Sequence, residues 1–411
     1  MNHHIHRMVD QLLLEQGEYL PLELLLQEGR LNYTDYEAWR SGELHCLDEA
    51  LFGDPKQMTQ LLQQAADYLQ HLGWQAETIA YRTWQNSSPR QLRFSQNSTL
   101  DHCFHQRYRK PQDQPQLDLF TDAPVTNLIN GITQALIDLN TAEARRQLEH
   151  LYDNAPDHIR LGELECLVEA SESQHTAVGD APAELQILQE TLIPLADRLL
   201  GKEGRNLLVL LWRRLSRALH AQPYQASQPK LHVSYTATQA MDWDAVNQAI
   251  EQEPNWQTEP VLLLRHATAS DYLHRQAEAL QDWFLLCWQF PEKSNLLKTS
   301  SNHALRQQWL SFLDLDPELP AQAFPAWLLI AEPGLTRILP EPGSMSDQSE
   351  TACPTSYRTL YLLQRNRLHP QPATGNKNNI ALRVQFKQQT PILFQHFLDS
   401  IDKSSPDYPS S

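Results

Sequence analysis

Glycine is scarce in this chain, with 13 residues among 411. Glycine supplies the positive-φ positions of tight hairpin turns and of phosphate-binding loops, so its scarcity argues against a many-stranded sheet and against a nucleotide-binding fold. Leu, Gln, Ala and Glu are abundant, and these residues favour helix. The sequence therefore predicts a mainly α-helical protein.

The chain has the composition of a globular, acidic protein. Apolar residues make up 41% and charged residues 20%, and 411 residues suffice for roughly two or three domains with their own cores. The net charge of -17 would repel a phosphate backbone if it were spread evenly over the surface. Composition therefore argues against a protein that coats nucleic acid.

The cysteines and the apolar runs indicate the compartment. The five cysteines lie far apart, and no CxxC pair occurs that would indicate a disulfide framework or a common zinc site. The N-terminus lacks the apolar core and cleavage site of a signal peptide, and the most apolar run, Leu207–Trp212, is too short to span a bilayer. We expect a cytoplasmic protein that does not contact a membrane.

Proline, glycine and polar clusters divide the chain into predicted regions. These are an N-terminal helical bundle (1–108) that includes a basic-aromatic segment (81–110), a Pro/Gln-rich linker (109–123), a helical hairpin region (124–221), a second, repeat-like helical region (231–339), a small basic C-terminal segment (357–400) and a disordered tail (401–411). The predicted fold is therefore a helical bundle followed by stacked helical hairpins.

The first helices of the chain are predicted to pack as an acidic bundle. The stretch Leu22–Trp39 has the length of a helix-turn-helix, but residues 1–72 contain four Lys or Arg against twelve Asp or Glu. A DNA-reading helix normally lies in a basic surface, so a packed helical bundle is the preferred interpretation. Thr34, three residues before Glu37, predicts a capping box at the start of one of these helices.

The basic-aromatic segment at 81–110 has two interpretations. Its aromatic residues could stack on bases while its cations grip a strand; alternatively, the aromatics belong to a core and the arginines pair with the acidic bundle, which we prefer. The aromatic residues are Tyr81, Trp84, Phe94, Phe104 and Tyr108. The candidate nucleic-acid ligands here are Arg90, Arg93, Arg107, Arg109 and Lys110.

One apolar pattern occurs twice in the helical regions. The residues with this shared spacing are Ala144, Leu148, Leu151 and Pro156, and then Ala279, Trp283, Leu286 and Pro291. The pattern resembles the tetratricopeptide repeat, in which small residues let two antiparallel helices approach and a proline ends the second. The resemblance covers about 124–156 and 260–291 and gives 231–339 a tetratricopeptide-like character. It implies stacked hairpins whose concave surface suits a peptide or protein partner.

The linker contains the pentapeptide Gln116-Leu117-Asp118-Leu119-Phe120. It resembles the short peptide by which bacterial polymerases and repair proteins dock on the sliding clamp of DNA replication, and all five positions fit that consensus. The resemblance implies that Gln116 forms hydrogen bonds in the clamp cleft, that Leu119 and Phe120 fill its apolar pocket, and that Leu117 supports them. The alternative is that these apolar residues pack on the following helix as a hydrophobic staple.

Two further stretches are locally basic. Residues 353–398 contain six Lys or Arg and no acid, and Arg365 and Arg367 are the candidate nucleic-acid ligands among them. The predicted helix near Leu199–His220 carries Arg205, Arg213, Arg214 and Arg217. Such surfaces suit a DNA-proximal factor, an acidic protein partner, or the acidic N-terminal bundle of the same chain. The last two are the more common arrangements.

The sequence contains none of the common catalytic or cofactor motifs. GxxxxGK[ST], GxSxG, HExxH and GxGxxG do not occur, so we predict no cofactor and name no catalytic residue. His102, Cys103 and His105 are close in sequence, but no fourth ligand follows, and we predict no metal site. A pair of catalytic carboxylates needs no signature and stays open.

These observations favour a non-enzymatic helical adaptor that binds a protein partner. Its more specific form is a bacterial accessory factor of DNA replication or repair that docks on the sliding clamp through residues 116–120. Two alternatives stay open. One is a nucleic-acid-processing enzyme of unrecognised type, and the other is a structural subunit of a larger complex.

Overall fold

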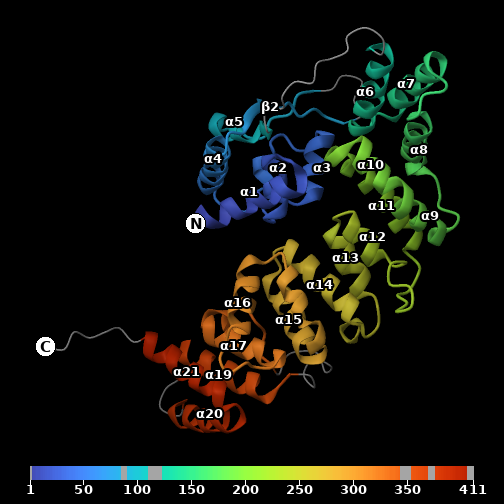
Figure 1. Cartoon of the computed structure of the whole chain (residues 1–411). Coiled ribbons are helices and arrows are strands. Elements are labelled where there is room, and N and C mark those ends of the chain that lie inside the picture. Colours follow the sequence, from blue (N-terminus) through green and yellow to red (C-terminus); the bar gives the residue numbers. More distant parts are fainter. Residues whose placement is uncertain (1, 85–89, 110–122, 343–352, 369–374, 405–411) are drawn as a thin grey trace. The chain divides into compact units, whose positions relative to one another are not determined.

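The computed structural model describes residues 2–84, 90–109, 123–342, 353–368 and 375–404. Most of these residues are helical, which confirms the predicted mainly α fold of helical hairpins (Figure 1). The chain forms two compact units, Met1–Asp242 and Trp243–Ser411. The boundary falls inside the region 231–339 that the sequence predicts as one helical block.

The first unit begins with short helices whose caps are visible in the sequence. They are α1 (Asn2–Gln16), α2 (Pro21–Gln27), α3 (Tyr33–Ser41), the 3-10 helix η1 (Leu47–Ala50), α4 (Pro55–His71) and α5 (Ser98–Phe104). Asp54 caps α4 by accepting from the Lys56 N–H at 3.0 Å, and Asn97 caps α5 in the same way from Thr99. Both are favoured N-cap residues because their side chains satisfy helix donors that lack an internal partner.

A small antiparallel sheet, which the sequence did not predict, joins distant parts of this region. Its strands are β1 (Glu18–Tyr19), β2 (Gln75–Thr78) and β3 (Gln106–Arg109), in the order β1-β3-β2. Tyr108 of β3 pairs with Tyr19 on one side and with Ala76 on the other. The strands have two to four residues, which is too short for a recognisable alternation of apolar and polar residues.

The rest of the first unit consists of helices that pack mostly against their neighbours in sequence. They are α6 (Ala123–Ile137), α7 (Thr141–Asn154), α8 (Leu161–Glu172), η2 (Ser173–His175), α9 (Ala181–Ile187), the π-helical turn η3 (Leu188–Leu192), α10 (Ile193–Leu199), η4 (Gly201–Gly204), α11 (Arg205–Leu219) and α12 (Val233–Gln239). In the α6–α7 hairpin, Ala144, Leu148 and Leu151 are fully buried, as their spacing predicts. At Gly131 of α6, a Cβ would lie 3.3 Å from the Gln147 side chain of α7, so the two helices approach closely there.

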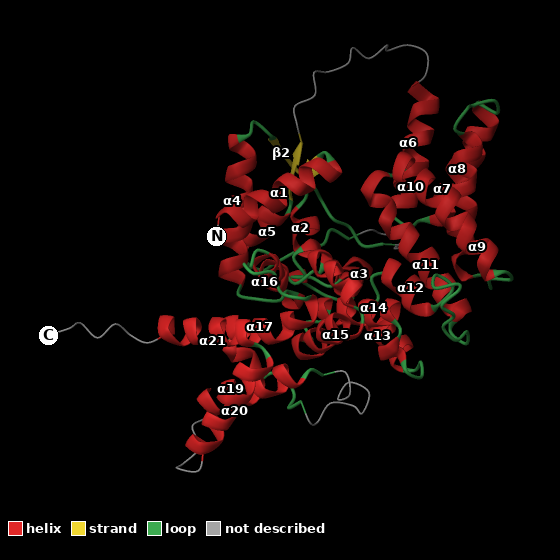
Figure 2. Cartoon of the chain, turned by 60° about the horizontal axis from the view of Figure 1, so that its bottom comes forward, coloured by secondary structure: helices red, strands yellow, loops and turns green. Residues whose placement is uncertain are grey.

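The second unit is helical throughout its described part. Its elements are α13 (Trp243–Glu251), η5 (Trp256–Thr258), α14 (Pro260–Tyr272), α15 (Gln276–Gln289), η6 (Pro291–Thr299), α16 (His303–Leu313), η7 (Ala321–Ala323), α17 (Phe324–Ala331), η8 (Pro333–Arg337), α19 (Thr355–Leu368), α20 (Gly375–Gln389) and α21 (Pro391–Ser404). Figure 2 shows the same helices from a second direction. Ala267 of α14 and Ala279 of α15 are 1% exposed, so small residues allow close packing of this hairpin.

Tryptophans form much of the core of the second unit. Trp283, Trp288, Trp309 and Trp327 are buried. Two others are half-buried: Trp243 stacks on Tyr272, and Trp256 contacts His266 with its ring tilted. Burial of such large rings contributes several kcal/mol each to stability, about 3–5 kcal/mol on truncation.

A buried polar cluster connects α13, α14 and α15. The Nδ1 of His266 lies 2.6 Å from an Asp282 carboxylate oxygen, and its Nε2 lies 3.4 Å from Glu251. Burial disfavours the imidazolium, but the hydrogen bond and charge of Asp282, followed by those of Glu251, raise the pKa of His266 overall. Nearby, burial raises the pKa of Asp271 to about 6, although Trp283 and Ser300 donate hydrogen bonds to it.

Candidate partner-binding surfaces

The sliding-clamp-like pentapeptide lies outside the described residues. Gln116, Leu117, Asp118, Leu119 and Phe120 all fall between Arg109, where β3 ends, and Ala123, where α6 begins. Lys110, one of the candidate nucleic-acid ligands, is in the same segment. The interpretation of this peptide therefore rests on its sequence.

The aromatic residues of segment 81–110 belong to the core of the first unit. Tyr81, Trp84, Phe94, Phe104 and Tyr108 are each at most 8% exposed. The rings of Phe94 and Phe104 stack with their centres 3.7 Å apart. Because bases need exposed rings to stack upon, these residues do not form a platform for a single strand. The preferred interpretation of these rings as core residues is confirmed.

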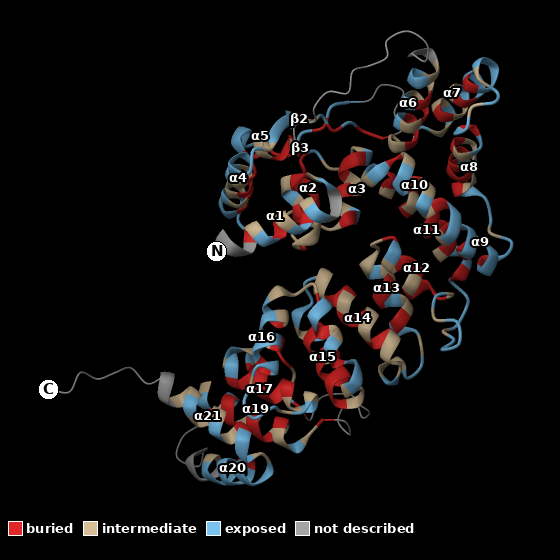
Figure 3. Cartoon of the chain, in the orientation of Figure 1, coloured by how far each residue is buried: buried red, intermediate tan, exposed pale blue. Residues whose placement is uncertain are grey.

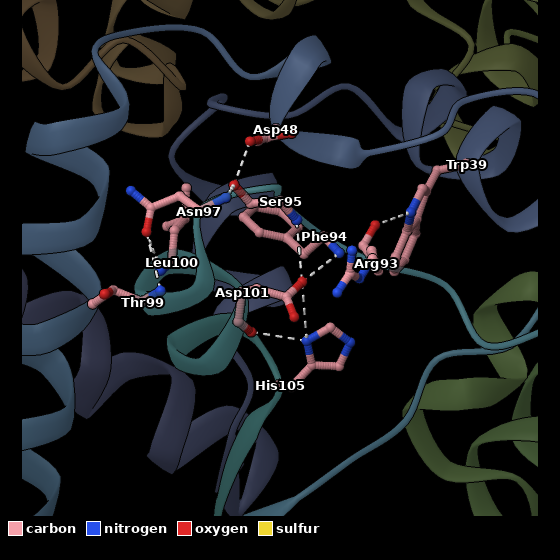
Figure 4. A network of polar contacts seen from close by, with 10 residues as sticks. All are labelled: Trp39, Asp48, Arg93, Phe94, Ser95, Asn97, Thr99, Leu100, Asp101 and His105. Atoms are coloured by element: carbon pink, nitrogen blue, oxygen red, sulfur yellow. Dashed lines mark hydrogen bonds and ion pairs between the residues drawn. The ribbon is translucent and has the colours of Figure 1, made fainter.

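A network of polar contacts fixes the loop that carries Phe94 (Figure 4). The carboxylate of Asp101 accepts from the backbone N–H groups of Phe94 and Ser95, at 2.8 and 3.1 Å. The Ser95 hydroxyl donates to Asp48, and the Trp39 indole donates to the Arg93 carbonyl oxygen at 2.8 Å. These contacts satisfy groups within the fold, and they account for the polar side chains without a catalytic role.

The two histidines near this loop do not lie in a group of possible metal ligands among the described residues. His105 Nδ1 donates to the Asp101 carbonyl oxygen at 2.8 Å, whereas His102 is exposed. Among the described residues, no three His, Cys, Asp or Glu side chains are grouped as metal ligands would be. All five cysteines are free thiols.

The candidate arginines of this segment divide into two pairs. Arg107 forms an ion pair with Glu77 at 2.7 Å, and Arg109 forms one with Glu18. Arg90 and Arg93 have exposed side chains instead. Two of the four described candidates therefore pair with acids of the N-terminal bundle, as the preferred interpretation of this segment expects.

The arginines of α11 are used inside the first unit. Arg205 pairs with Glu23 of α2 at 3.1 Å, and Arg213 pairs with Glu37 of α3. Arg214, which is 8% exposed, pairs with Glu184, and Arg217 donates to the Gln174 carbonyl oxygen at 3.1 Å. The interpretation in which this basic helix pairs with the acidic N-terminal bundle of the same chain is confirmed for Arg205 and Arg213.

A small open pocket lies where this bundle meets η4 and α11. Its charged side chains include Glu23 and Arg205, which pair with each other, and Lys202, which lies 3.5 Å from Glu18. The Tyr33 hydroxyl donates to the Asn206 side chain at 2.7 Å. Most of the polar chemistry at this pocket therefore connects the bundle to the helices behind it.

The C-terminal helices present a different kind of basic surface. One side of α20 is covered: Phe386 is fully buried beside Phe394 and Phe397 of α21, and Asn379 accepts a hydrogen bond from Asn366 of α19 at 2.8 Å. Leu382 also packs against this core. The spacing of these residues is that of one helical stripe.

The opposite side of α20 is exposed (Figure 3). Ile380 is 61% and Val384 is 52% exposed. Arg383 and Lys387 lie beside them, one helical turn apart, and neither cation forms an ion pair within the described part of the chain. We call Ile380, Arg383, Val384 and Lys387 the basic face of α20.

Sequence reasoning selected other cations of this region. Arg365 pairs with Glu341 at 2.7 Å, and Arg367 is exposed on α19. The signal for Arg383 and Lys387 was available in the sequence, because they alternate with Ile380 and Val384 at helical spacing within a stretch that lacks acids. What the sequence could not show is which side of α20 faces the core.

Comparison with protein-family models, with curated proteins and with solved structures finds no match to this chain. None of the helices in the described ranges is both long and apolar enough to cross a membrane.

Proposed function

We propose that the chain is a helical adaptor that binds a protein partner. The observation that carries this proposal is the basic face of α20, where two exposed branched apolar side chains lie beside two cations that form no ion pair among the described residues. Apolar side chains that share an accessible surface with charged groups are typical of protein interfaces. The complementary partner has an acidic surface with apolar residues at its centre.

The arrangement of the helices supports the same function. Helices that follow one another pack together in α6–α7 and in α13, α14 and α15. A stack of such hairpins offers an extended surface and needs no catalytic group to act. The resemblance of 124–156 and 260–291 to tetratricopeptide repeats is part of the proposal and agrees with this use.

The more specific proposal is that the adaptor docks on a bacterial sliding clamp through Gln116–Phe120. The support is the fit of all five residues to the clamp-binding consensus. One polar hook and two large apolar anchors are the usual content of a peptide hot spot. In this proposal Gln116 forms the hydrogen bonds, and Leu119 and Phe120 fill the pocket of the clamp.

Calorimetry with purified bacterial sliding clamp tests this docking. We expect binding of the intact chain at about micromolar Kd, as for other short peptide motifs. The triple variant Gln116→Ala/Leu119→Ala/Phe120→Ala should lose at least about tenfold in affinity, which is about 1.4 kcal/mol. A control variant in the same segment, Gln112→Ala/Gln114→Ala, should bind as the wild type does. Equal binding by the wild type and the triple variant would exclude this docking mode.

The nucleic-acid alternative has less support. Its favourable observation is the exposure of Arg90 and Arg93, but the rings of the same segment are buried, and Arg107 and Arg109 are paired. Binding of single-stranded DNA that weakens steeply with salt would favour it over the adaptor. No measurable affinity at low salt would exclude it.

A further inference from the structure

A second exposed apolar surface in the second unit carries the opposite charge. On α16, Leu310 is 42% and Leu313 is 39% exposed. The core side of this helix is formed by other residues: Leu305, Trp309 and Phe312 are buried. Leu310 and Leu313 are therefore not needed to hold α16 in place.

Three acids follow these leucines directly. Asp314, Asp316 and Glu318 are exposed and form no ion pair among the described residues. Arg306, one turn before Leu310, is directed elsewhere, because its Nη1 donates to the Ser300 carbonyl oxygen at 2.6 Å. We call Leu310, Leu313, Asp314, Asp316 and Glu318 the acidic face of α16.

The two faces are complementary in composition. Each presents two branched apolar side chains. The charges that form no ion pair among the described residues are cations on α20 and carboxylates at and just after the C-terminal end of α16. Pairing them would bury apolar area while it places opposite charges beside each other. Within the second unit, α16 and α20 lie apart from each other in both Figure 1 and Figure 2, so one copy does not bring its own two faces together.

We propose that the acidic face of α16 in one copy of the chain binds the basic face of α20 in a second copy. This inference rests on the proposed function, because it names the partner of the same α20 face. The two faces differ, so the contact is heterologous: each copy that joins leaves one free face of each kind at the ends of the assembly. The result is head-to-tail association that grows with protein concentration.

The contact involves few residues, so it is a small interface and weak. We expect a dissociation constant of roughly tens of micromolar for this contact. Opposite charges contribute to the contact, and salt screens them over about 10 Å at 0.1 M. The association should therefore weaken as the salt concentration rises.

Sedimentation equilibrium of the full-length chain tests the proposal with two complementary variants. The basic-face variant is Arg383→Gln/Val384→Ser/Lys387→Gln, and the acidic-face variant is Leu310→Ser/Leu313→Ser/Asp314→Asn. All six positions are exposed, so both variants should keep the helical circular dichroism of the wild type. The control variant Lys293→Gln/Lys298→Gln removes two exposed cations of the same unit that belong to neither face.

We expect the average mass of the wild type and of the control variant to rise with concentration and to fall with added salt. Each face variant alone should stay monomeric. An equimolar mixture of the two should form a one-to-one dimer and nothing larger, because each variant retains only one of the two faces.

Three results would overturn the proposal: a wild type that stays monomeric at about 100 µM and low salt, a mass distribution that neither face variant changes, or a mixture that forms no dimer. A monomeric wild type that still binds the sliding clamp would retain the adaptor function and remove self-association. Self-association without clamp binding would retain the head-to-tail contact and exclude docking on the clamp. The two proposals can therefore fail independently of each other.

Discussion

The helices α11 and α20 are both basic in sequence, but they differ in whether their cations form ion pairs. On α11, Arg205, Arg213 and Arg214 all pair with acids of the same unit. On α20, Arg383 and Lys387 have no acidic partner among the described residues. A cluster of cations in a sequence therefore does not locate a binding surface, because the acids that neutralise it are set by the fold.

The neighbours of each helix explain the difference. α11 lies against a bundle whose first 72 residues contain twelve acids, and acids from α2 and α3 reach it. α20 packs against α19 and α21; α19 contains no acid, and Asp399 of α21 accepts a hydrogen bond from Gln395 of the same helix. Cations between such neighbours stay available for another molecule. The predictions below test whether α11 cations stabilise the fold and whether α20 cations do not.

The largest effect is expected at Arg214. Its side chain is 8% exposed, pairs with Glu184 and donates to the Thr176 carbonyl oxygen at 2.9 Å. Arg214→Ala leaves these acceptors without their donor, and it should lower the free energy of unfolding by about 3 kcal/mol. Urea denaturation followed by far-UV circular dichroism measures this. A decrease in the free energy of unfolding of less than about 0.5 kcal/mol would mean that Arg214 contributes no more to stability than an exposed cation does.

A partnered cation in the second unit should respond to pH. Because Asp282 and Glu251 raise the pKa of His266, its contribution to stability is fully present below the unfolded value of 6.5 and is lost as pH rises through the higher folded value. Burial raises the pKa of Asp271 to about 6, so this carboxyl changes the free energy of unfolding with pH mainly below about pH 6. The part of a slope above pH 6.5 that disappears when His266 is replaced is attributable to His266 and its contact with Asp282.

The variant His266→Gln isolates that contribution. It should destabilise the second unit by about 2 kcal/mol near pH 6, since Asp282 loses its charged hydrogen-bond donor and a neutral amide takes its place. The gap between variant and wild type should narrow as pH rises to about 8. Thermal melts at several pH values measure both effects. A gap that is constant with pH would show that the pair does not titrate in this range.

A smaller effect is expected for the pair that joins α2 and α11. Arg205 and Glu23 are partly exposed, with side-chain exposures of 31% and 11%, so solvent screens their attraction. A double-mutant cycle with Arg205→Ala and Glu23→Ala should give a coupling of about 1 kcal/mol that decreases with added salt. Zero coupling would mean that this contact does not hold the bundle against α11.

The smallest effect on stability is expected on α20. Arg383→Ala/Lys387→Ala should change the free energy of unfolding by less than about 0.5 kcal/mol, because both side chains are exposed and neither forms an ion pair among the described residues. The same urea denaturation serves as the measurement. A loss comparable to that of Arg214→Ala would contradict the assignment of these cations to a free surface.

The helical fold and much of the core were predictable from local patterns. The hairpin positions Ala144, Leu148 and Leu151, and likewise Ala279, Trp283 and Leu286, are buried as their spacing indicates. Such positions repeat at helical period, and neighbouring helices satisfy them, so no distant information is needed.

The features that sequence reasoning missed depend on contacts between distant residues. The predicted capping box of Thr34 and Glu37 is wrong: α3 begins at Tyr33 after Asn32, and Glu37 pairs with Arg213 of α11. Glu23 and Arg205 meet although they are 182 residues apart in the chain. Local spacing contains no information about such partners, and the same is true of the sheet that joins Tyr19 to Tyr108.

Quantitative chemical labelling of the intact chain tests the difference between α11 and α20 most directly. Arginines are modified with phenylglyoxal and lysines with an amine-reactive reagent, and the rate at each site is read by mass spectrometry. The structure predicts fast modification of Arg383 and Lys387 and slow modification of Arg213 and Arg214, with protection of the α20 sites when a partner or a second copy binds. Equal rates on the two helices, or slow modification of Arg383, would contradict the conclusion that α20 carries the accessible binding surface.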